Sequence, residues 1–246
     1  MKADSAILMG TQVSSFPQDG CAVVIGASGA IGSALRLRLE DDGRISRTIG
    51  FSRAAGPLIE ITSDSAIADA AAAVGALSQP VRLVIDATGF LHGSGAYPEK
   101  SLSAIDSGHM AEAFAVNAIG PALLMKHFLP LLADDGKAVF CTLSARVGSI
   151  ADNRLGGWYS YRASKAALNQ LVRTASIELK RRRPAAVCVA YHPGTVDSLL
   201  SRPFQKTGLN VQTPDAAAEA CLSVIDRLTH ADSGGFFDYT GKSVPW

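Results

Sequence analysis

Short apolar runs alternate with longer helical stretches along most of this chain, and this alternation restricts the possible folds more than any other feature. Runs such as "AVVIG" and "LVIDAT" are almost entirely apolar, which is typical of strands buried on both faces of a sheet. The expected strands are Cys21–Gly26, Thr48–Ser52, Leu58–Thr62, Leu83–Thr88, Ala138–Ser144, Ala186–Tyr191 and Gly235–Tyr239. The expected helices lie near residues 30–41, 65–77, 108–132, 158–182 and 214–229. This order predicts a doubly wound α/β fold with a single seven-stranded, mainly parallel sheet and helices on both of its faces.

The length and composition fit one large domain. The chain has 246 residues, of which 48% are hydrophobic, and this is enough for one substantial core. No internal repeat, low-complexity segment or linker divides it. Residues 1–19 precede the first expected strand, and Ser14, Ser15 and Pro17 disfavour regular structure there. We therefore expect a flexible N-terminal extension over 1–19 and a single domain over 20–246.

Charge, cysteine and histidine usage exclude several classes of protein. Lys and Arg together number 23 against 22 for Asp and Glu, so the net charge of +1 does not suggest a nucleic-acid or membrane-surface partner. No apolar run approaches the roughly eighteen residues of a membrane span, and Asp4, Gln12 and Asp19 interrupt any signal-peptide core. The four cysteines are scattered and the five histidines lack ligand spacing. These features predict a soluble, cytoplasmic protein with reduced cysteines and no metal site.

A glycine-rich turn connects the first expected strand to the first expected helix. The motif "GASGAIG", Gly26 to Gly32, is followed directly by the helical "SALRLRLE". Glycines allow the backbone to approach a ligand closely, and the N–H groups at a helix N-terminus bind anions. In this strand–turn–helix context the motif predicts dinucleotide binding in a Rossmann fold.

The end of the second expected strand predicts which dinucleotide is bound. Sites for NAD place an acidic residue about twenty positions after the glycine loop, where it hydrogen-bonds the ribose 2′-hydroxyl. This chain has Ser52 and Arg53 there, in "IGFSRAAG". Both side chains can hydrogen-bond a 2′-phosphate, and Arg53 adds a full positive charge. NADP is therefore the expected cofactor, although Arg53 could also be a solvated strand end.

The stretch "YSYRASKAALNQ" contains the main candidates for chemistry. Residues four apart share one face of a helix, so the phenol of Tyr161 and the ammonium of Lys165 can lie side by side. Tyr159 and Arg162 have only alanines at that spacing and gain no such partner. A Tyr-x-x-x-Lys pair alone is a weak signal, and the surrounding motifs give it weight.

Taken together, these motifs resemble those of the short-chain dehydrogenase/reductase family, in its short single-domain, carbonyl-reductase-like and C-factor-like branch. "GASGAIG" resembles the family's cofactor loop, "DATG" (Asp86 to Gly89) its Asn-Asn-Ala-Gly motif, and "YRASKAALN" its tyrosine–lysine motif. Asn117 in "FAVNAIG" resembles the helix asparagine of the catalytic tetrad, and "HPGTVDS" resembles the family's Pro-Gly turn. Only Gly89 of "DATG" is identical to the corresponding residue of the family's motif.

The glycine loop, the expected strand ends and the resemblance assign the following site residues. The catalytic candidates are Tyr161, Lys165, Asn117 and Ser144. The cofactor-binding candidates are Gly26, Ser28, Gly29, Ala30, Ile31, Gly32, Ser52, Arg53, Glu60, Ile61, Ala87, Thr88, Gly89, Tyr161, Lys165, Pro193, Gly194, Val196 and Ser198.

One catalytic position departs from the family's pattern. The family's catalytic serine is the second of a Ser-Ser pair that closes the fifth expected strand, and matching "SARVGSI" to that pair places Ala145 there. Ser144, one residue earlier, or Ser149, beyond Gly148, could take over its role, and we favour Ser144 because it ends a strand at the ligand-binding edge. It can serve only if the strand loses its regular alternation there. Alternatively, both serines are structural.

The resemblance implies an NADP(H)-dependent oxidoreductase that reduces a small ketone or aldehyde to an alcohol by hydride transfer. It implies that Tyr161 is the proton donor and acceptor, that Lys165 lowers the pKa of the phenol, and that Asn117 anchors a water. An ammonium about 5 Å from the phenol supplies about 3 kcal/mol toward the phenolate at an effective dielectric near 20. We expect the loop Asp197–Gln212 to cover the substrate pocket.

Two further expectations follow from the resemblance and from Ala145. The family implies a homodimer or homotetramer, with the helices that begin near 108 and 158 at the interface. The missing serine leaves an alternative open, in which the chain is a catalytically weak NADP-binding protein that signals or senses redox state.

Overall fold

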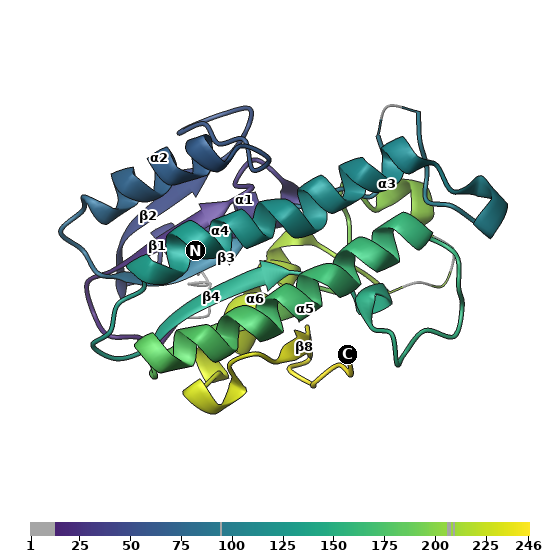
Figure 1. Ribbon diagram of the computed structural model, residues 1–246. Helices are drawn as coiled ribbons and strands as arrows, with labels where there is room; N and C mark the ends of the chain where they lie inside the picture. Colours follow the sequence, from purple (N-terminus) through teal and green to yellow (C-terminus); the bar gives the residue numbers. More distant parts are fainter. Residues whose placement is uncertain (1–12, 94, 206–207, 209) are drawn as a thin grey trace, which may run out of the picture.

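The computed structural model describes residues 13–93, 95–205, 208 and 210–246. Its main sheet is parallel throughout, with the strand order β2-β1-β3-β4-β5-β8 (Figure 1). The strands are β1 (Gly20–Ile25), β2 (Ile45–Phe51), β3 (Val81–Asp86), β4 (Ala138–Leu143), β5 (Ala186–His192) and β8 (Phe236–Asp238). Two short strands, β6 (Thr195–Val196) and β7 (Val211–Gln212), pair separately.

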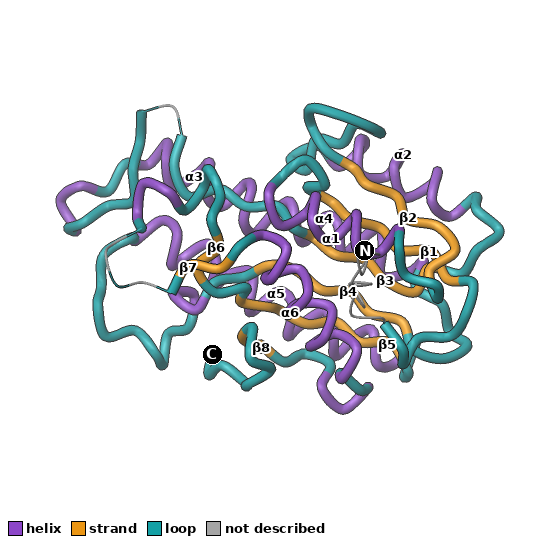
Figure 2. Tube along the Cα trace, turned by 180° about the vertical axis from the view of Figure 1, so that it is seen from behind, coloured by secondary structure: helices purple, strands orange, loops and turns teal. Residues whose placement is uncertain are grey.

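Helices cover both faces of this sheet, as the alternating pattern predicted (Figures 1 and 2). One face packs against α1 (Ala30–Glu40) and α6 (Pro214–Arg227). The other packs against α2 (Asp64–Gly75), α4 (Gly120–Phe128) and α5 (Tyr159–Arg182). The helix α3 (Ser107–Phe114) continues through a π-helical segment, η2 (Ala115–Ile119), into α4. The doubly wound α/β fold is confirmed.

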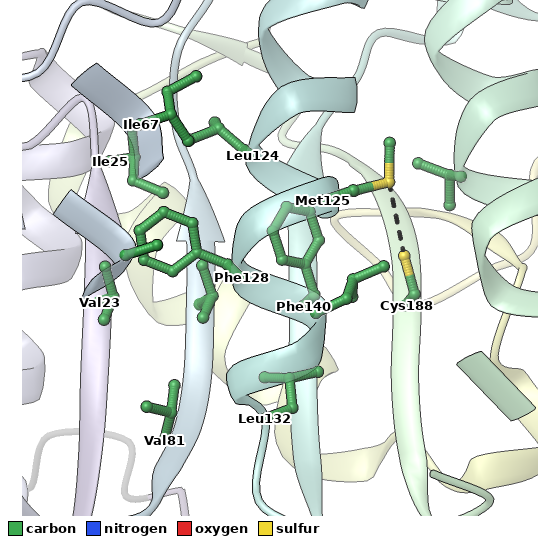
Figure 3. Packing of buried hydrophobic residues seen from close by; sticks show 14 of the residues in the cluster. Val23, Ile25, Ile67, Val81, Leu124, Met125, Phe128, Leu132, Phe140 and Cys188 are labelled. Atoms are coloured by element: carbon green, nitrogen blue, oxygen red, sulfur yellow. Dashed lines mark hydrogen bonds between the residues drawn. The ribbon is translucent and has the colours of Figure 1, made fainter. Parts of the chain in front are cut away.

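Strand residues alternate between two cores because successive side chains point to opposite faces of a strand. Val23 of β1 and Phe140 of β4 face α4, and Phe128 of that helix is fully buried against this face of the sheet (Figure 3). On the same face, the thiol of Cys188 lies 3.9 Å from the sulfur of Met125. Val24 faces the opposite core, with Leu35 of α1. Nearly every residue of the central strands is buried, which explains their unbroken apolar runs.

The expected strand Leu58–Thr62 is wrong, so the main sheet has six strands in the described part of the chain instead of seven. A single bridge joins Ser52 to Leu58, and the chain then turns into α2. Leu58 is 69% exposed, whereas Ile59 and Ile61 are buried. Exposed and buried residues do alternate in this segment. However, no neighbouring backbone continues the pairing beyond Leu58, and α2 begins directly after its N-cap, Ser63.

The N-terminal prediction also needs correction where the structure describes it. Val13 and Phe16 are buried in the core between the sheet and α6. The hydroxyl of Ser15 donates to the carboxylate of Asp226 on α6, and the ammonium of Lys137 donates to the Ser15 hydroxyl at 2.8 Å. The segment from Val13 to Phe16 is therefore packed against the domain, while residues 1–12 of the expected extension lie outside the described residues.

The helical stretch Ser107–Leu131 is long and apolar enough, by length and composition, to cross a membrane. Leu124, Met125 and Phe128 of this stretch are buried against the sheet. These contacts are those of a core helix.

Candidate active site

Two hollows lie side by side at the carboxyl ends of the strands, where open parallel sheets bind ligands. The first, which we call the glycine-loop cleft, has a volume of about 220 Å³. Its lining includes Gly26, Ser28, Gly29, Ser52, Arg53, Glu60, Ile61, Ala87, Thr88 and Gly89, all of them expected cofactor residues. The second, the tyrosine pocket, has a volume of about 340 Å³. Its lining includes Ile31, Ser144, Ala145, Tyr161, His192, Pro193, Gly194, Val196, Ser198 and Phe204.

The glycine loop is shaped for the close approach of a ligand. Gly26 has a φ of +83°, a conformation that favours glycine. A Cβ on Gly32 would lie 2.2 Å from the carbonyl oxygen of Gly26, so only glycine fits there. Gly29 precedes α1 with no side-chain cap, which leaves the helix N-terminus to backbone groups. Ala30 begins α1, and neither it nor Gly32 lines a hollow. This geometry fits a dinucleotide's phosphates.

Ser52 and Arg53 contribute to the cleft in different ways. Ser52 is buried, and its hydroxyl donates to the Ala55 carbonyl at 2.6 Å and accepts from the Ala54 and Ala55 N–H groups. It therefore fixes the turn that presents Arg53, which is exposed. On the cleft's other side, Glu60 accepts from Thr62, and this bond together with Arg53 holds the pKa of Glu60 below its usual value. Arg53 is therefore the residue that can offer a positive charge to a phosphate in the cleft.

Tyr161 and Lys165 lie together near the start of α5, as their spacing predicted. The Lys165 ammonium lies 6.0 Å from the centre of the Tyr161 ring and donates to the Leu143 carbonyl at 2.7 Å. Burial raises the pKa of the Tyr161 phenol, and burial lowers the pKa of Lys165 to about 8. The Tyr161 phenol is therefore protonated at neutral pH. Because the pKa of Lys165 is about 8, the groups around its side chain decide whether it is charged or neutral.

Asn117 is placed by the π-helical segment η2, an irregularity common at functional sites. Its side-chain oxygen accepts from the Phe90 N–H at 2.8 Å, and its side-chain nitrogen donates to the Phe90 carbonyl and to the hydroxyl of Ser164. Asn117 thus ties the strand-end segment after Gly89 to α5, behind Tyr161. The sequence located this residue but gave no indication of Phe90 as its partner.

Ser144 and Ser149 occupy different surroundings. Ser144 lines the tyrosine pocket beside Ala145, and its hydroxyl donates to the side-chain oxygen of Asn169 on α5 at 2.7 Å. Ser149 does not line the pocket, and its hydroxyl donates to the carbonyl of Pro245 and accepts from the Asp152 N–H. Ser149 therefore joins the loop after β4 to the C-terminus, and Ser144 is the serine at the pocket.

The Pro193–Gly194 turn closes the far side of the tyrosine pocket. Gly194 has a φ of +78°, and a Cβ there would lie 2.5 Å from the amide nitrogen of Gln212. Val196 belongs to β6, and the hydroxyl of Ser198 lies 3.2 Å from that of Ser201. All the residues that the sequence assigned to this turn line the pocket.

An aromatic wall around the pocket was not predicted. The ring of Trp158 lies 6.1 Å from that of Tyr161 and 5.2 Å from that of Phe204, and His92 lies 5.4 Å from Phe204. Trp158 has a φ of +54°, unusual for a residue with a side chain. Its N–H donates to the Glu99 carbonyl at 2.5 Å. The only sequence signal was the preceding Gly156 and Gly157, because the partners come from distant segments.

Glu99 also caps α5. It is 3% exposed, and its carboxylate accepts from both the backbone N–H and the hydroxyl of Ser160, in the first turn of α5. A carboxylate at a helix N-terminus stabilises unpaired N–H groups and the helix dipole. No sequence pattern links Glu99 to Ser160.

The described part of the chain contains neither a metal-ligand cluster nor a disulfide. No group of three or more His, Cys, Asp or Glu side chains is arranged to hold a metal ion there. All four cysteines are buried and unpaired with one another by disulfides.

Comparison with known proteins identifies the family. The family model described as enoyl-(acyl carrier protein) reductase matches residues 42–221. The short-chain dehydrogenase srdF of Neurospora crassa is 33% identical over 198 residues, covering 77% of this chain and 76% of that protein. The chain belongs to the short-chain dehydrogenase/reductase family. It is an oxidoreductase of that family, and the resemblance in the sequence motifs is confirmed.

Two further similarities bear on function. The C-signal protein of Myxococcus xanthus is 39% identical over 146 residues, covering 59% of this chain and 84% of that protein. The NADPH-bound carbonyl reductase from chicken fatty liver superposes with a TM-score of 0.81 at 26% identity, covering 94% of this chain and 100% of that one.

Proposed function

We propose that this short-chain dehydrogenase/reductase is an NADP(H)-dependent carbonyl reductase acting on a small ketone or aldehyde. The observation that carries the proposal is the position of Tyr161 at a largely apolar pocket, with the Lys165 ammonium 6.0 Å from its ring. Ile31 of the glycine loop lines the same pocket, so a dinucleotide held by that loop can extend to the tyrosine. Similarity to an NADPH-bound carbonyl reductase supports the same reaction class.

NADP is the cofactor that the cleft fits. Arg53 is exposed at the cleft, on the turn fixed by Ser52, and supplies the positive charge that a 2′-phosphate requires. Gly26, Gly29 and Gly32 allow the backbone to approach the pyrophosphate. At the other end, Val196 and Ser198 follow the Pro193–Gly194 turn and would hold the carboxamide of the nicotinamide.

The protein's own groups then manage the proton and the developing charge. NADPH, when bound, supplies the hydride that reduces the carbonyl carbon. Tyr161 gives its phenolic proton to the carbonyl oxygen, which completes the alcohol, and it can do so because burial keeps the phenol protonated. The Lys165 ammonium stabilises the phenolate that remains.

Two other side chains, Ser144 and Asn117, contribute to the proposed site. Ser144 is our candidate to donate a hydrogen bond to the carbonyl oxygen, because it lines the pocket beside Ala145. Its hydroxyl would have to turn from Asn169 to do so. Asn117 holds Phe90 and Ser164 around α5, and one of its hydrogen bonds would have to yield if it is to bind a proton-relay water.

The test is NADPH consumption, followed by absorbance, against a panel of small ketones, aldehydes and quinones. The wild type should turn over at least one of them. The Tyr161→Phe variant should lose about 10²–10⁴ in turnover while binding NADPH normally, since it lacks only the acid. Turnover by Tyr161→Phe at the wild-type rate would rule out the proposed acid.

A second candidate function is a catalytically weak NADP-binding protein that signals or senses redox state. Two observations favour it: Ala145 stands where the family has its catalytic serine, and the chain is 39% identical to the C-signal protein over 146 residues. Wild-type NADPH binding with no turnover across the panel would favour this candidate over the reductase.

We also propose a cytoplasmic homodimer or homotetramer. The outer face between α4 and α5 carries a groove lined by Leu129, Pro130, Leu171, Ala175 and Leu179 among others. These are the helices near 108–132 and 158–182 that we expected at the interface. Light scattering at micromolar concentration tests this, and a monomeric mass would contradict it.

A further inference from the structure

Lys165 is a buried cation whose described hydrogen bond goes to a neutral group. Lys165 is 2% exposed, and its ammonium donates to the Leu143 carbonyl at 2.7 Å. Removing an ammonium from water is costly unless an opposite charge compensates. The proposed function needs this ammonium charged, because only the charged form stabilises the tyrosine's phenolate.

A buried acid lies at the adjacent strand end. Asp86 is the last residue of β3 and is 1% exposed. Its carboxylate accepts from the Thr88 N–H at 3.0 Å, the Thr88 hydroxyl at 2.6 Å and the Thr142 hydroxyl at 2.7 Å. Three donors pointing at one carboxyl group are what an ionised carboxylate requires, because it can only accept.

The acid and the ammonium meet at neighbouring residues of β4. Asp86 lies opposite Thr142 in the β3–β4 ladder, and Leu143, the next residue of β4, accepts from Lys165. Asp86, Thr142 and Lys165 are all buried, so water screens the attraction weakly. Burial lowers the pKa of Lys165, and Asp86 acts in the opposite direction by raising it.

Two titratable groups beside this pair are neutral. The Tyr161 phenol of α5 lies beside Lys165, and burial raises its pKa. Cys141 of β4, which feels the charge of Asp86, is held as a thiol because its contact with Cys221 and burial raise its pKa. Asp86 is thus the anion that acts on Lys165 in the described structure.

We propose that Asp86 is a positioning residue for the proposed reaction, whose buried carboxylate keeps the Lys165 ammonium charged beside Tyr161. The family's Asn-Asn-Ala-Gly motif has an uncharged amide where this chain has Asp86 in "DATG". The proposal rests on the proposed function for its catalytic consequence, but the coupling of Asp86 to Lys165 can be measured without any turnover.

The test compares the wild type with Asp86→Asn, which keeps the shape and the acceptor oxygen but removes the charge. The protein is labelled with ¹³C at the lysine Cε, the Lys165 signal is assigned by its loss in Lys165→Met, and its titration is followed by NMR. Losing an anion destabilises the ammonium, so the midpoint should fall by on the order of one pH unit. An unchanged midpoint would overturn the proposal.

Thr142→Val is the matched control, because it removes one hydrogen bond to the carboxylate and leaves the charge. Its Lys165 midpoint should stay close to that of the wild type. An equal fall in Thr142→Val and Asp86→Asn would mean that a packing change, and not the charge, moves Lys165. Asp86→Ser is a second uncharged variant in case Asp86→Asn does not fold.

The pH profile of carbonyl reduction then tests the catalytic consequence. Activity should fall as the pH rises through the pKa of Lys165, and this fall should begin at lower pH in Asp86→Asn by the same interval as the NMR midpoint. A shifted midpoint with an unshifted profile would overturn the positioning role. If the wild type turns over no substrate, the proposed function fails, and the NMR titration still decides whether Asp86 holds the charge on Lys165.

Discussion

The glycine-loop cleft and the tyrosine pocket share one edge of the sheet but are built in different ways. The cleft is shaped largely by backbone, through Gly26, Gly29 and Gly32 in a single strand–turn–helix unit, and its charge comes from the exposed Arg53. The pocket is built from side chains, and burial sets the pKa values of Tyr161, which lines it, and of Lys165 beside Tyr161. Changes at the glycines of the cleft should therefore act through shape, whereas changes at Arg53 and in the pocket should act through charge and hydrogen bonding.

The largest effect on the cleft should come from Gly32→Ala. The added methyl group would lie 2.2 Å from the Gly26 carbonyl oxygen and 2.8 Å from its carbon, so the loop backbone must move. The moved backbone would lose hydrogen bonds to the charged pyrophosphate, each of which contributes about 1.5–3 kcal/mol, so we expect NADPH affinity to fall by about a hundredfold. Titration by fluorescence measures it. Gly43→Ala is the matched control, because a Cβ at Gly43 meets nothing within 4 Å.

In the pocket, Ser144→Ala should lower turnover by about 10²–10³, the typical cost of losing one donor to a developing oxyanion. NADPH affinity should be nearly unchanged, because the proposed partner of Ser144 is the substrate's carbonyl oxygen and Ser144 does not line the cleft. Steady-state kinetics with a measured NADPH Kd separate the two effects.

Two companion variants show whether Ser144 truly takes the serine's role. Ser149→Ala should leave turnover within a few fold and instead lower thermal stability, because Ser149 bonds the C-terminus. Ala145→Ser should change turnover by less than about tenfold if Ser144 already supplies the donor. A much larger gain in Ala145→Ser would show that the role was vacant.

The burial of His192 at the tyrosine pocket should also make the stability of the fold depend on pH. Burial lowers the pKa of His192 from 6.5 to about 4, so between these values the unfolded chain binds more protons than the folded one. The stability from the neutral imidazole is fully present above pH 6.5 and is lost as the pH falls toward 4, by up to about 3 kcal/mol.

Denaturant unfolding of the wild type and His192→Gln between pH 4 and 7 checks this expectation. The variant should show a flatter dependence of the unfolding free energy on pH over that interval. His230→Gln serves as the control, since His230 is exposed. Parallel curves for the wild type and His192→Gln would contradict the assignment.

The smallest expected effect belongs to the exposed charge of the cleft. Arg53→Ala should remove most of the preference for NADP over NAD, by about 10- to 150-fold, because a hydrogen bond to a charged group contributes about 1.5–3 kcal/mol. The ratio of the two cofactors' Kd values measures it. Arg47→Ala, on strand β2 and outside the cleft, should leave that ratio unchanged. A wild type with equal affinity for both cofactors would refute the role of Arg53.

The sequence alone determined the features that depend on neighbouring residues. The glycine loop was predictable because strand, turn and helix follow one another within Gly20–Glu40. The pairing of Tyr161 with Lys165 was predictable because the helical repeat brings residues four apart together. The unbroken apolar runs predicted a sheet covered on both faces, because each strand side chain must be buried on one face or the other.

Only the tertiary structure decided the features that depend on distant partners. Leu58–Thr62 alternates like a strand, but a strand requires a neighbouring backbone, and the chain pairs at one bridge before entering α2. Local composition suggested a loose N-terminal extension, yet Val13 and Phe16 are buried because α6 supplies a surface for them. The fold also brings Asp86 and Lys165 to neighbouring residues of β4, and it brings Glu99 to Ser160, from separate elements. Contacts between side chains far apart in sequence carry no periodicity or spacing, so they become visible only once the fold has brought them together.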